Sequence, residues 1–386
     1  MRYLFAVFSV IAFSQLIIAQ EKESVDGTSY LKRGIALVEK GHYNQALVDF
    51  NKAIELNPND SLGYISRGII FEKSRNHDLA LADFNKAIEL NPNNFLVYIR
   101  RGVIFKRKRE YDLALADFNK AIELNPRGAS GYSNRGVLFR KRGDYDLALV
   151  DFNRAIELNP RDASGYSGRG ALFREKEDYD SALADFNKAI KLNPRYVVGY
   201  ISRGIFYEEN GDYDLALADF NKAIELNPRY VLGYISRGVF FKKRSNHDLA
   251  LADFNKAIEI SPKNTVGYFN RGLLFEEKGD YDLAITDYTR VLGFNDLDVM
   301  AYIRRGHCWT KKLNFHSALT DFAKALEIDP KSHMAYYFRG NAMADKGFYG
   351  KAKADYKKAI KLAKNEKDTK AATEYQKRAE FYQLNK

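Results

Sequence analysis

The chain has 386 residues, a formal net charge of +11, and 46% hydrophobic and 14% aromatic residues, which is enough apolar bulk for a continuous core. The single cysteine, Cys308, excludes an intrachain disulfide and any metal site built from several cysteines, and it is expected to be a small buried residue. The charge is uneven, since residues 351–386 hold eleven Lys or Arg against five Asp or Glu. Such a basic end is typical either of a solvated helix pair or of a contact with an anionic surface.

Residues 1–19 have the order of a secretory signal peptide. A basic start at Met1 and Arg2 precedes an apolar run from Tyr3 to Ile18 and the small residue Ala19. The run is shorter than the roughly 20 residues that a membrane span needs. We therefore expect cleavage near Ala19, a linker over 20–26, and export to a periplasm, a cell envelope or the exterior. An uncleaved anchor is the alternative.

A repeat of 34 residues then fills 27–366 as ten rows without insertions. We number the positions of each repeat from 1 to 34, starting at Gly27. Position 4 is aromatic, position 8 is Gly, position 20 is Ala and position 24 is Phe or Tyr in every row. In the sixth row these residues are Tyr200, Gly204, Ala216 and Phe220.

The spacings predict two antiparallel helices in each row, because residues three and four apart share one helix face. Small residues at positions 8 and 20 let the two helices approach closely, and aromatic residues fill the space around them. In the sixth row Gly211 is expected to break the first helix and Asp214 to cap the second. Asn227-Pro228 ends the second helix, because the residue before proline avoids the α region.

The pattern resembles the tetratricopeptide repeat family. The sixth row shows the whole signature, at Tyr200, Gly204, Ala216, Phe220, Ala223 and Pro228. The resemblance implies an all-α fold, an α-solenoid in which helix pairs stack into a right-handed superhelix with the first helices on the concave side. Residues 367–386 are expected to form a final helix that caps the solenoid, as the exposed end of a repeat array requires.

Two charged positions depart from the family pattern, because position 7 is Arg and position 23 is Asp in all ten rows. In a hairpin that turns near position 16, these side chains come within reach of each other. We therefore expect a ladder of Arg–Asp pairs that fixes the register between helices rather than adding much net stability. The ladder residues include Arg67, Asp83, Arg101, Asp117, Arg135, Asp151, Arg203, Asp219, Arg237 and Asp253.

No catalytic constellation, metal site or cofactor motif is found in the sequence. The acidic residues recur at fixed repeat positions, which suits caps and surface pairs better than acid–base catalysis. His307 and His316 have no third ligand nearby, and no phosphate-binding glycine loop occurs. Basic and acidic rows alternate, whereas nucleic-acid binding would need a continuous basic stripe. We expect a non-enzymatic protein with no metal, no cofactor and no nucleic-acid partner.

The family uses positions 2, 5, 9, 12 and 13 of the first helices to bind partners. The resemblance places aliphatic residues at positions 5 and 9 on the floor of a groove, with charges at positions 12 and 13 along its sides. The predicted groove residues are Ile65, Ile69, Ile99, Val103, Lys106, Arg107, Arg140, Lys141, Ile201, Ile205, Glu208, Ile235, Val239, Lys242, Lys243, Phe269 and Leu273. The alternative is that the aliphatic residues only pack neighbouring repeats together.

These features predict an exported scaffold that binds a protein or an extended or helical peptide, in cell-envelope assembly for example. An anionic polymer bound by rows three and four and by the basic C-terminal end is a second hypothesis. A secreted effector that acts on host proteins is a third. Salt separates the first two, because polymer binding weakens steeply as ionic strength rises.

Overall fold

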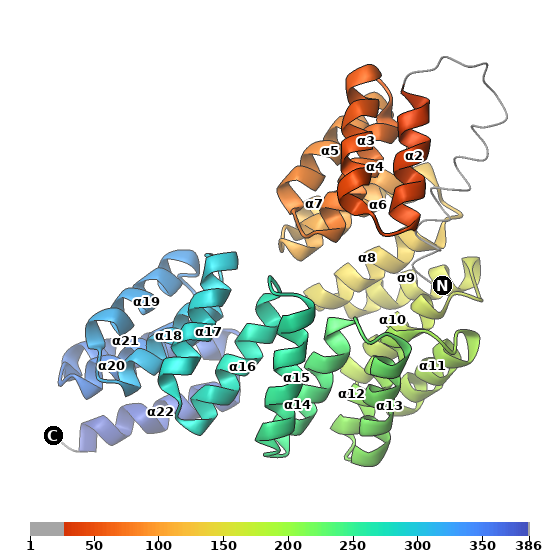
Figure 1. The fold of residues 1–386 in the computed structure, drawn as a ribbon. Coiled ribbons are helices and arrows are strands. Elements are labelled where there is room, and N and C mark those ends of the chain that lie inside the picture. Colours follow the sequence, from red (N-terminus) through yellow and green to blue (C-terminus); the bar gives the residue numbers. More distant parts are fainter. Residues whose placement is uncertain (1–26, 385–386) are drawn as a thin grey trace. The chain divides into compact units, whose positions relative to one another are not determined.

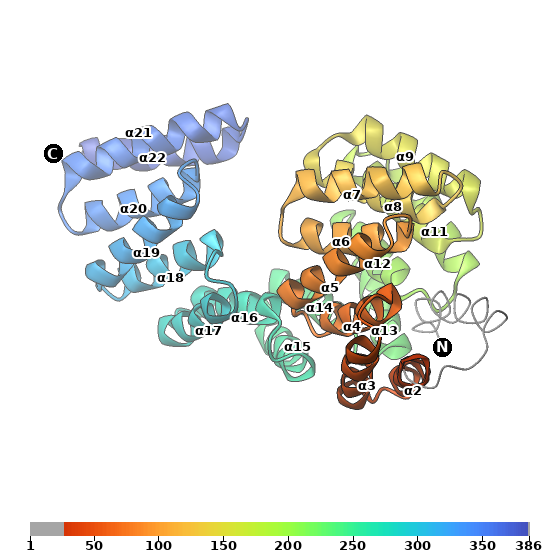
Figure 2. The same cartoon turned by 90° about the horizontal axis from the view of Figure 1, so that it is seen from above.

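In a computed structural model, residues 27–384 are described, and every regular element among them is an α-helix. The predicted all-α solenoid of stacked helix pairs is confirmed. Figures 1 and 2 show successive helices lying side by side as antiparallel pairs. The predicted signal peptide (1–19) and linker (20–26) lie outside the described residues.

Each repeat supplies one helix pair. The first helices are α2 (Thr28–Glu39), α4 (Ser61–Lys73), α6 (Phe95–Arg107), α8 (Ala129–Arg142), α10 (Ala163–Glu175), α12 (Val197–Glu209), α14 (Val231–Lys243), α16 (Thr265–Lys278), α18 (Val299–Lys311) and α20 (His333–Asp345). The second helices are α3 (Tyr43–Leu56), α5 (His77–Leu90), α7 (Tyr111–Leu124), α9 (Tyr145–Leu158), α11 (Tyr179–Leu192), α13 (Tyr213–Leu226), α15 (His247–Ile260), α17 (Tyr281–Phe294), α19 (Phe315–Ile328) and α21 (Tyr349–Asn365). The final helix is α22 (Thr369–Leu384).

The glycine at position 8 and the aromatic residue at position 24 set the distance between the helices of a pair. A Cβ built on Gly204 of α12 would lie 2.8 Å from Cε1 of Phe220 in α13, so only glycine fits there. Phe220 and Ala216 are fully buried. The hydrophobic core is thus a line of such contacts, one within each helix pair, rather than a single central cluster.

The ends of the second helices differ in one respect from the prediction. The N-cap position of α13 is held by Asp212, which makes no side-chain capping hydrogen bond, whereas Asp214 lies in the first turn. The expectation that Asp214 caps the helix is therefore wrong, although a carboxylate there still interacts favourably with the helix dipole. The other end agrees with expectation, since Asn227 stands in a non-helical conformation before Pro228.

The described residues divide into two compact units, with the boundary between Gly199 and Tyr200 inside α12. In the first unit, Phe84, Phe118, Phe152 and Phe186 of successive second helices are fully buried. In the second unit, Phe254, Tyr288 and Phe322 occupy the same repeat position and are equally buried. No helix between residues 27 and 384 combines the length and apolarity that a bilayer crossing requires.

Helix α22 covers the last repeat. Ala372 and Tyr375 of α22 are buried against Ala359 and Ala363 of α21. Without α22 this apolar face of the final pair would be open to water. The helix expected over 367–386 thus lies where an array of repeats needs its end covered.

Candidate binding surface

The arginine at position 7 and the aspartate at position 23 of each repeat form a two-bonded ion pair. In the sixth repeat, Arg203 Nε and Nη2 donate to the two carboxylate oxygens of Asp219 at 2.7 and 2.8 Å. The same geometry links Arg33–Asp49, Arg67–Asp83, Arg101–Asp117, Arg135–Asp151, Arg169–Asp185, Arg237–Asp253, Arg271–Asp287, Arg305–Asp321 and Arg339–Asp355. Paired donors of this kind fix orientation as well as distance.

Electrostatics within these pairs show the cost of burial. The hydrogen bonds that Arg203 donates to Asp219 raise the pKa of Arg203. Burial raises the pKa of Asp117, and this effect outweighs the lowering by Arg101. The pairs therefore hold the helices in register while losing much of their attraction to desolvation.

Most of these arginines also reach back to the preceding repeat, a contact that sequence reasoning missed. Arg101 Nη1 donates to Asn85 Oδ1 at 2.8 Å, and Asn85 stands at position 25 of the repeat before. Equivalent bonds join Arg67 to Asn51, Arg135 to Asn119, Arg169 to Asn153, Arg237 to Asn221, Arg271 to Asn255 and Arg305 to Thr289. The recurrence of asparagine at position 25 was the available signal. The guanidinium thus connects two neighbouring repeats.

The aliphatic residues predicted at position 5 of the groove floor are mostly buried in contacts between repeats. Ile65, Ile99, Ile201 and Ile235 have only 6–9% of their surface exposed. Ile65 packs with Phe84 and with Val97 of the next repeat, so it belongs to the core between repeats. The expectation of an exposed floor is wrong for these four residues, because the following first helix covers them.

The residues predicted at position 9 remain half-buried, as does Phe269 at position 5. This group comprises Ile69, Val103, Ile205, Val239, Leu273 and Phe269. They pack against the core clusters of their own repeats, as Ile205 does beside Phe220 and Phe240. The apolar surface that a partner can reach is therefore narrower than the sequence suggested.

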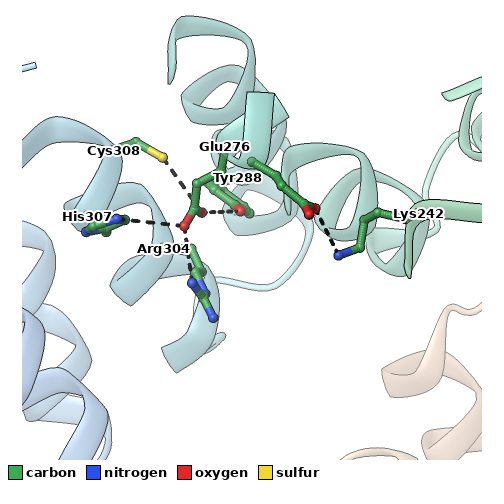
Figure 3. Close-up of polar contacts among 7 residues, drawn as sticks. Lys242, Glu276, Tyr288, Arg304, His307 and Cys308 are labelled. Carbon is green, nitrogen blue, oxygen red and sulfur yellow. Dashed lines mark hydrogen bonds and ion pairs between the residues drawn. The ribbon is translucent and has the colours of Figure 1, made fainter. Parts of the chain in front are cut away.

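The charges at positions 12 and 13 are mostly paired with one another across repeats. Arg140 of the fourth repeat pairs with Glu175 of the fifth. Lys242 Nζ lies 3.3 Å from Glu277 Oε2 (Figure 3). Glu208, whose side chain is only 7% exposed, accepts from Lys243 at 3.4 Å and Arg244 at 3.2 Å. These pairs hold adjacent first helices together.

Lys106 is different, because its neighbours are basic. Its ammonium lies 5.9 Å from the ring centre of Phe118. Burial, followed by the charges of Lys141, Arg107 and Arg140, lowers its pKa to about 8. No carboxylate of residues 27–384 forms an ion pair with it. The four predicted basic residues of repeats three and four thus lie in one cluster.

A buried polar cluster in repeats eight and nine was not predicted (Figure 3). Glu276 accepts a hydrogen bond from the Tyr288 hydroxyl at 2.8 Å and from Arg304 Nη1 at 3.1 Å. His307 Nε2 lies 3.9 Å from Oε1 of Glu276, and Cys308 Sγ lies 3.9 Å from Oε2. Tyr288 replaces the phenylalanine usual at position 24, which was the sequence signal for a polar contact.

The chemistry of this cluster is structural. Burial raises the pKa of the Cys308 thiol and of the Tyr288 hydroxyl, so neither group is an anion at neutral pH. Burial lowers the pKa of His307 to about 4, which keeps its ring neutral. A protonated buried thiol is a poor nucleophile. Within residues 27–384 no group of three or more His, Cys, Asp or Glu side chains is arranged to hold a metal ion.

The stacked hairpins and their line of charged first-helix positions define an α-solenoid of the interaction-scaffold class. Models of the tetratricopeptide repeat match residues 28–60, 61–94, 95–127, 129–162, 163–196, 197–230, 233–264, 254–286 and 335–366. The chain belongs to the tetratricopeptide repeat family. Proteins of this family bind proteins or peptides, and their fold is typically non-enzymatic. No curated protein matches the chain significantly.

Solved structures that are similar to this chain have low sequence identity to it. Yeast Tom70 is similar with 18% identity and a TM-score of 0.54, over 93% of this chain and 96% of that one. Cut9 in the Cut9–Hcn1 hetero-tetramer of the APC/C has 15% identity and a TM-score of 0.54, over 91% and 83%. A tetratricopeptide repeat protein from Parabacteroides merdae has 21% identity and a TM-score of 0.47, over 64% and 97%.

Proposed function

We propose that this protein is an exported, non-enzymatic scaffold that binds a peptide segment of a partner protein along its first helices, in cell-envelope assembly. One observation carries the proposal. The residues that recur in every repeat are consumed by internal contacts, whereas position 13 is exposed in every repeat and changes charge from one repeat to the next. Side chains that vary on a constant framework are those available for recognition of a particular partner.

Positions 9 and 13 provide surface of two kinds for that partner. Ile205 and Val239 are half-buried, while Glu209, Lys243 and Glu277 are exposed. A peptide with an apolar side and complementary charges would therefore find both contacts on neighbouring helices. Export rests on the predicted signal peptide at residues 1–19.

Site-specific photocrosslinking tests the binding face. A photoreactive amino acid at Lys243, on first helix α14, should capture the partner in cells. The same group at Lys256, a lysine on second helix α15 with 44% of its side chain exposed and paired with Glu259, is the matched control and should capture nothing. Equal capture from both helices, or none from α14 and its neighbours, would contradict the proposed face.

Export has its own test. The mature protein should be found outside the cytoplasm, with an N-terminus that follows Ala19. An intact Met1 on cytoplasmic protein would exclude export by this route while leaving the binding face untouched.

The anionic-polymer hypothesis is favoured by one feature of the last repeat. In most second helices the basic residue at position 26 pairs with a glutamate three residues later, as Lys222 does with Glu225. In α21 the equivalent residues are Lys358 and Lys361, and both are exposed. Polyphosphate binding that falls steeply with salt, and that is lost when Lys358 and Lys361 become glutamates, would support this second function.

A further inference from the structure

Two of the four basic residues at position 12 pair in the same way. Arg140 of the fourth repeat pairs with Glu175, and Lys242 of the seventh pairs with Glu277. In both cases the carboxylate lies 35 residues later, at position 13 of the next repeat. Both cations are part-buried, so this acceptor offsets much of the cost of removing the charge from water.

Lys106 occupies position 12 of the third repeat, and it has no such carboxylate at position 13 of the next repeat. The residue 35 positions later is Lys141, which places a like charge where Glu175 and Glu277 stand in the other pairs. The second place from which a partner could come is position 6 of the next repeat, from which Arg100 and Arg304 reach the glutamates at position 12. In the fourth repeat it is Asn134, whose amide donates to the Ser130 carbonyl instead.

Among residues 27–384, no element packed around Lys106 offers a carboxylate to its ammonium group. On α6, Arg107 is a like charge. On α7, Phe118 presents its ring, and the carboxylate of Asp117 is held by Arg101. On α8, Arg140 and Lys141 add positive charge, and Arg140 leaves its buried Nε without a hydrogen-bond partner among the described residues.

We propose that Lys106 and Lys141 form a carboxylate-binding subsite, in which an acidic side chain of the partner peptide takes the place that Glu175 and Glu277 fill in other repeats. This inference rests on the proposed peptide-binding function and names the chemistry of its ligand. The ligand is a short acidic stretch with one or two carboxylates. Arg107 lies 3.7 Å from Glu72, and Glu175 holds Arg140, so carboxylates flank the subsite on both sides. Among residues 27–384 this leaves Lys106 and Lys141 as the two cations of the cluster without a carboxylate, which suits one or two carboxylates of a peptide.

The test uses the purified chain and two fluorescent peptides of the same apolar–polar pattern, one with two adjacent glutamates and one with glutamines in their place. The unaltered protein should bind the glutamate peptide about tenfold more tightly than the glutamine peptide. Lys141→Glu should abolish that preference, because it restores the built-in acceptor for Lys106. Lys106→Gln should abolish it as well.

Lys222→Gln is the control, since it removes a lysine that lies on second helix α13, outside the proposed face, and already pairs with Glu225. It should leave the preference unchanged. The converse variant, Glu277→Lys, recreates the arrangement of Lys106 and Lys141 in repeats seven and eight, and it should add a second site for the glutamate peptide.

A second readout reports on Lys106 directly. In reductively methylated protein, the NMR signal of the Lys106 dimethylamine should titrate near pH 8 and should move to higher pH when the glutamate peptide is added. Lys141→Glu should produce the same upward movement without any peptide. A midpoint near that of the exposed lysines would show that Lys106 is not held in a basic environment, and the inference would fail.

The remaining outcomes also decide the question. Equal affinity for both peptides, or an unchanged preference in Lys141→Glu, overturns the subsite. Polyphosphate that binds here more tightly than the peptide, with a steep salt dependence, overturns the peptide ligand in favour of a polymer. If partner capture at Lys243 persists in any of these cases, the proposed scaffold function stands and only the subsite is lost.

Discussion

Lys106 and Glu276 occupy the same place in two repeats, and their surroundings could hardly differ more. Each stands at position 12 of a first helix, close to the aromatic residue at position 24 of its own repeat. Glu276 receives the Tyr288 hydroxyl and Arg304 (Figure 3). Lys106 lies beside the ring of Phe118 and near three other positively charged side chains.

The difference teaches how a repeat protein acquires a site without changing its fold. The backbone and the small and aromatic residues place the position-12 side chain where it is largely shielded from water, and in repeats two to eight that side chain is charged. Residues at positions 6 and 13 of the next repeat then determine whether that charge pairs within the protein or remains available to a ligand. Glu276 shows the first outcome and Lys106 the second.

The largest effect should come from the ladder, which is the same in both regions. Asp117→Ala in the third repeat and Asp287→Ala in the eighth should each lower the free energy of unfolding by about 2–3 kcal/mol, because a buried two-bonded pair is broken while the arginine remains partly exposed. Urea unfolding measures both, with the exposed Asp112→Ala as control. Unchanged midpoints would show that the ladder does not stabilise the fold, and unequal losses would show that position 12 influences it.

Glu276→Leu should lower the free energy of unfolding by about 2 kcal/mol, because the fully buried Tyr288 hydroxyl loses its acceptor and Arg304 loses its counter-charge. Tyr288→Phe in the same chain should recover part of this loss, since it removes the orphaned hydroxyl. A double-mutant cycle measured by urea unfolding gives the coupling. Additive losses would mean that Glu276 and Tyr288 do not act together.

Lys106→Met should have the opposite sign and raise the free energy of unfolding by about 1 kcal/mol at pH 7. The lysine pKa is about 8 in the fold and 10.5 ordinarily, so the unfolded chain binds more protons between these values. The advantage of methionine is therefore complete below pH 8 and fades as pH rises toward 10.5. Thermal melts at both pH values measure it. The paired Lys242→Met is the control and should not stabilise.

His307 should make the Glu276 region sensitive to acid. Its pKa is about 4 in the fold against 6.5 ordinarily, so stability is present above pH 6.5 and is lost as pH falls toward 4. The loss should be somewhat under 1 kcal/mol, because the ring keeps some contact with solvent. Melting temperatures of the parent and of His307→Phe across this range test it. Parallel curves would remove His307 from the acid response.

The smallest effect belongs to the bond between repeats. Asn85→Ala should cost about 0.5 kcal/mol, because the bond to Arg101 is exposed. Asn85→Asp should keep that bond and serve as the matched variant. Urea midpoints of the two variants give the comparison, and an equal loss in both would assign the effect to helix propensity instead.

Much of the fold could be predicted from the sequence because each 34-residue repeat places glycine at position 8 opposite an aromatic residue at position 24. It likewise places arginine at position 7 opposite aspartate at position 23. The register of one hairpin follows from those alignments alone. The bond from Arg101 to Asn85 did not, because it depends on how one hairpin lies on the previous one. The burial of Ile65 and Ile235 was missed for the same reason, since a first helix faces both its own partner and the next repeat.

The sites were harder to predict than the fold. Lys106 and Lys141 were identified from the sequence, but so were Arg140, Lys242 and Glu208, which turned out to be paired internally. Whether a charge is free depends on a residue 28 or 35 positions away, and that spacing emerges only when the repeats are stacked. The Glu276 cluster was missed because only Tyr288 signals it in the sequence.

The arginine that links two repeats also bears on how such a chain can change its length. Arg101 bonds Asp117, 16 residues ahead, and Asn85, 16 residues behind. Excising or duplicating 34 residues anywhere in the regular rows returns an asparagine and an aspartate to those same offsets. An insertion or deletion of any other length would leave the arginine at the junction without its aspartate or asparagine partner. Genetic exchange of whole 34-residue units therefore restores these bonds at the new junction. The identical stretches Asn76–Ile88 and Asn246–Ile258 are what such exchange would leave in the sequence.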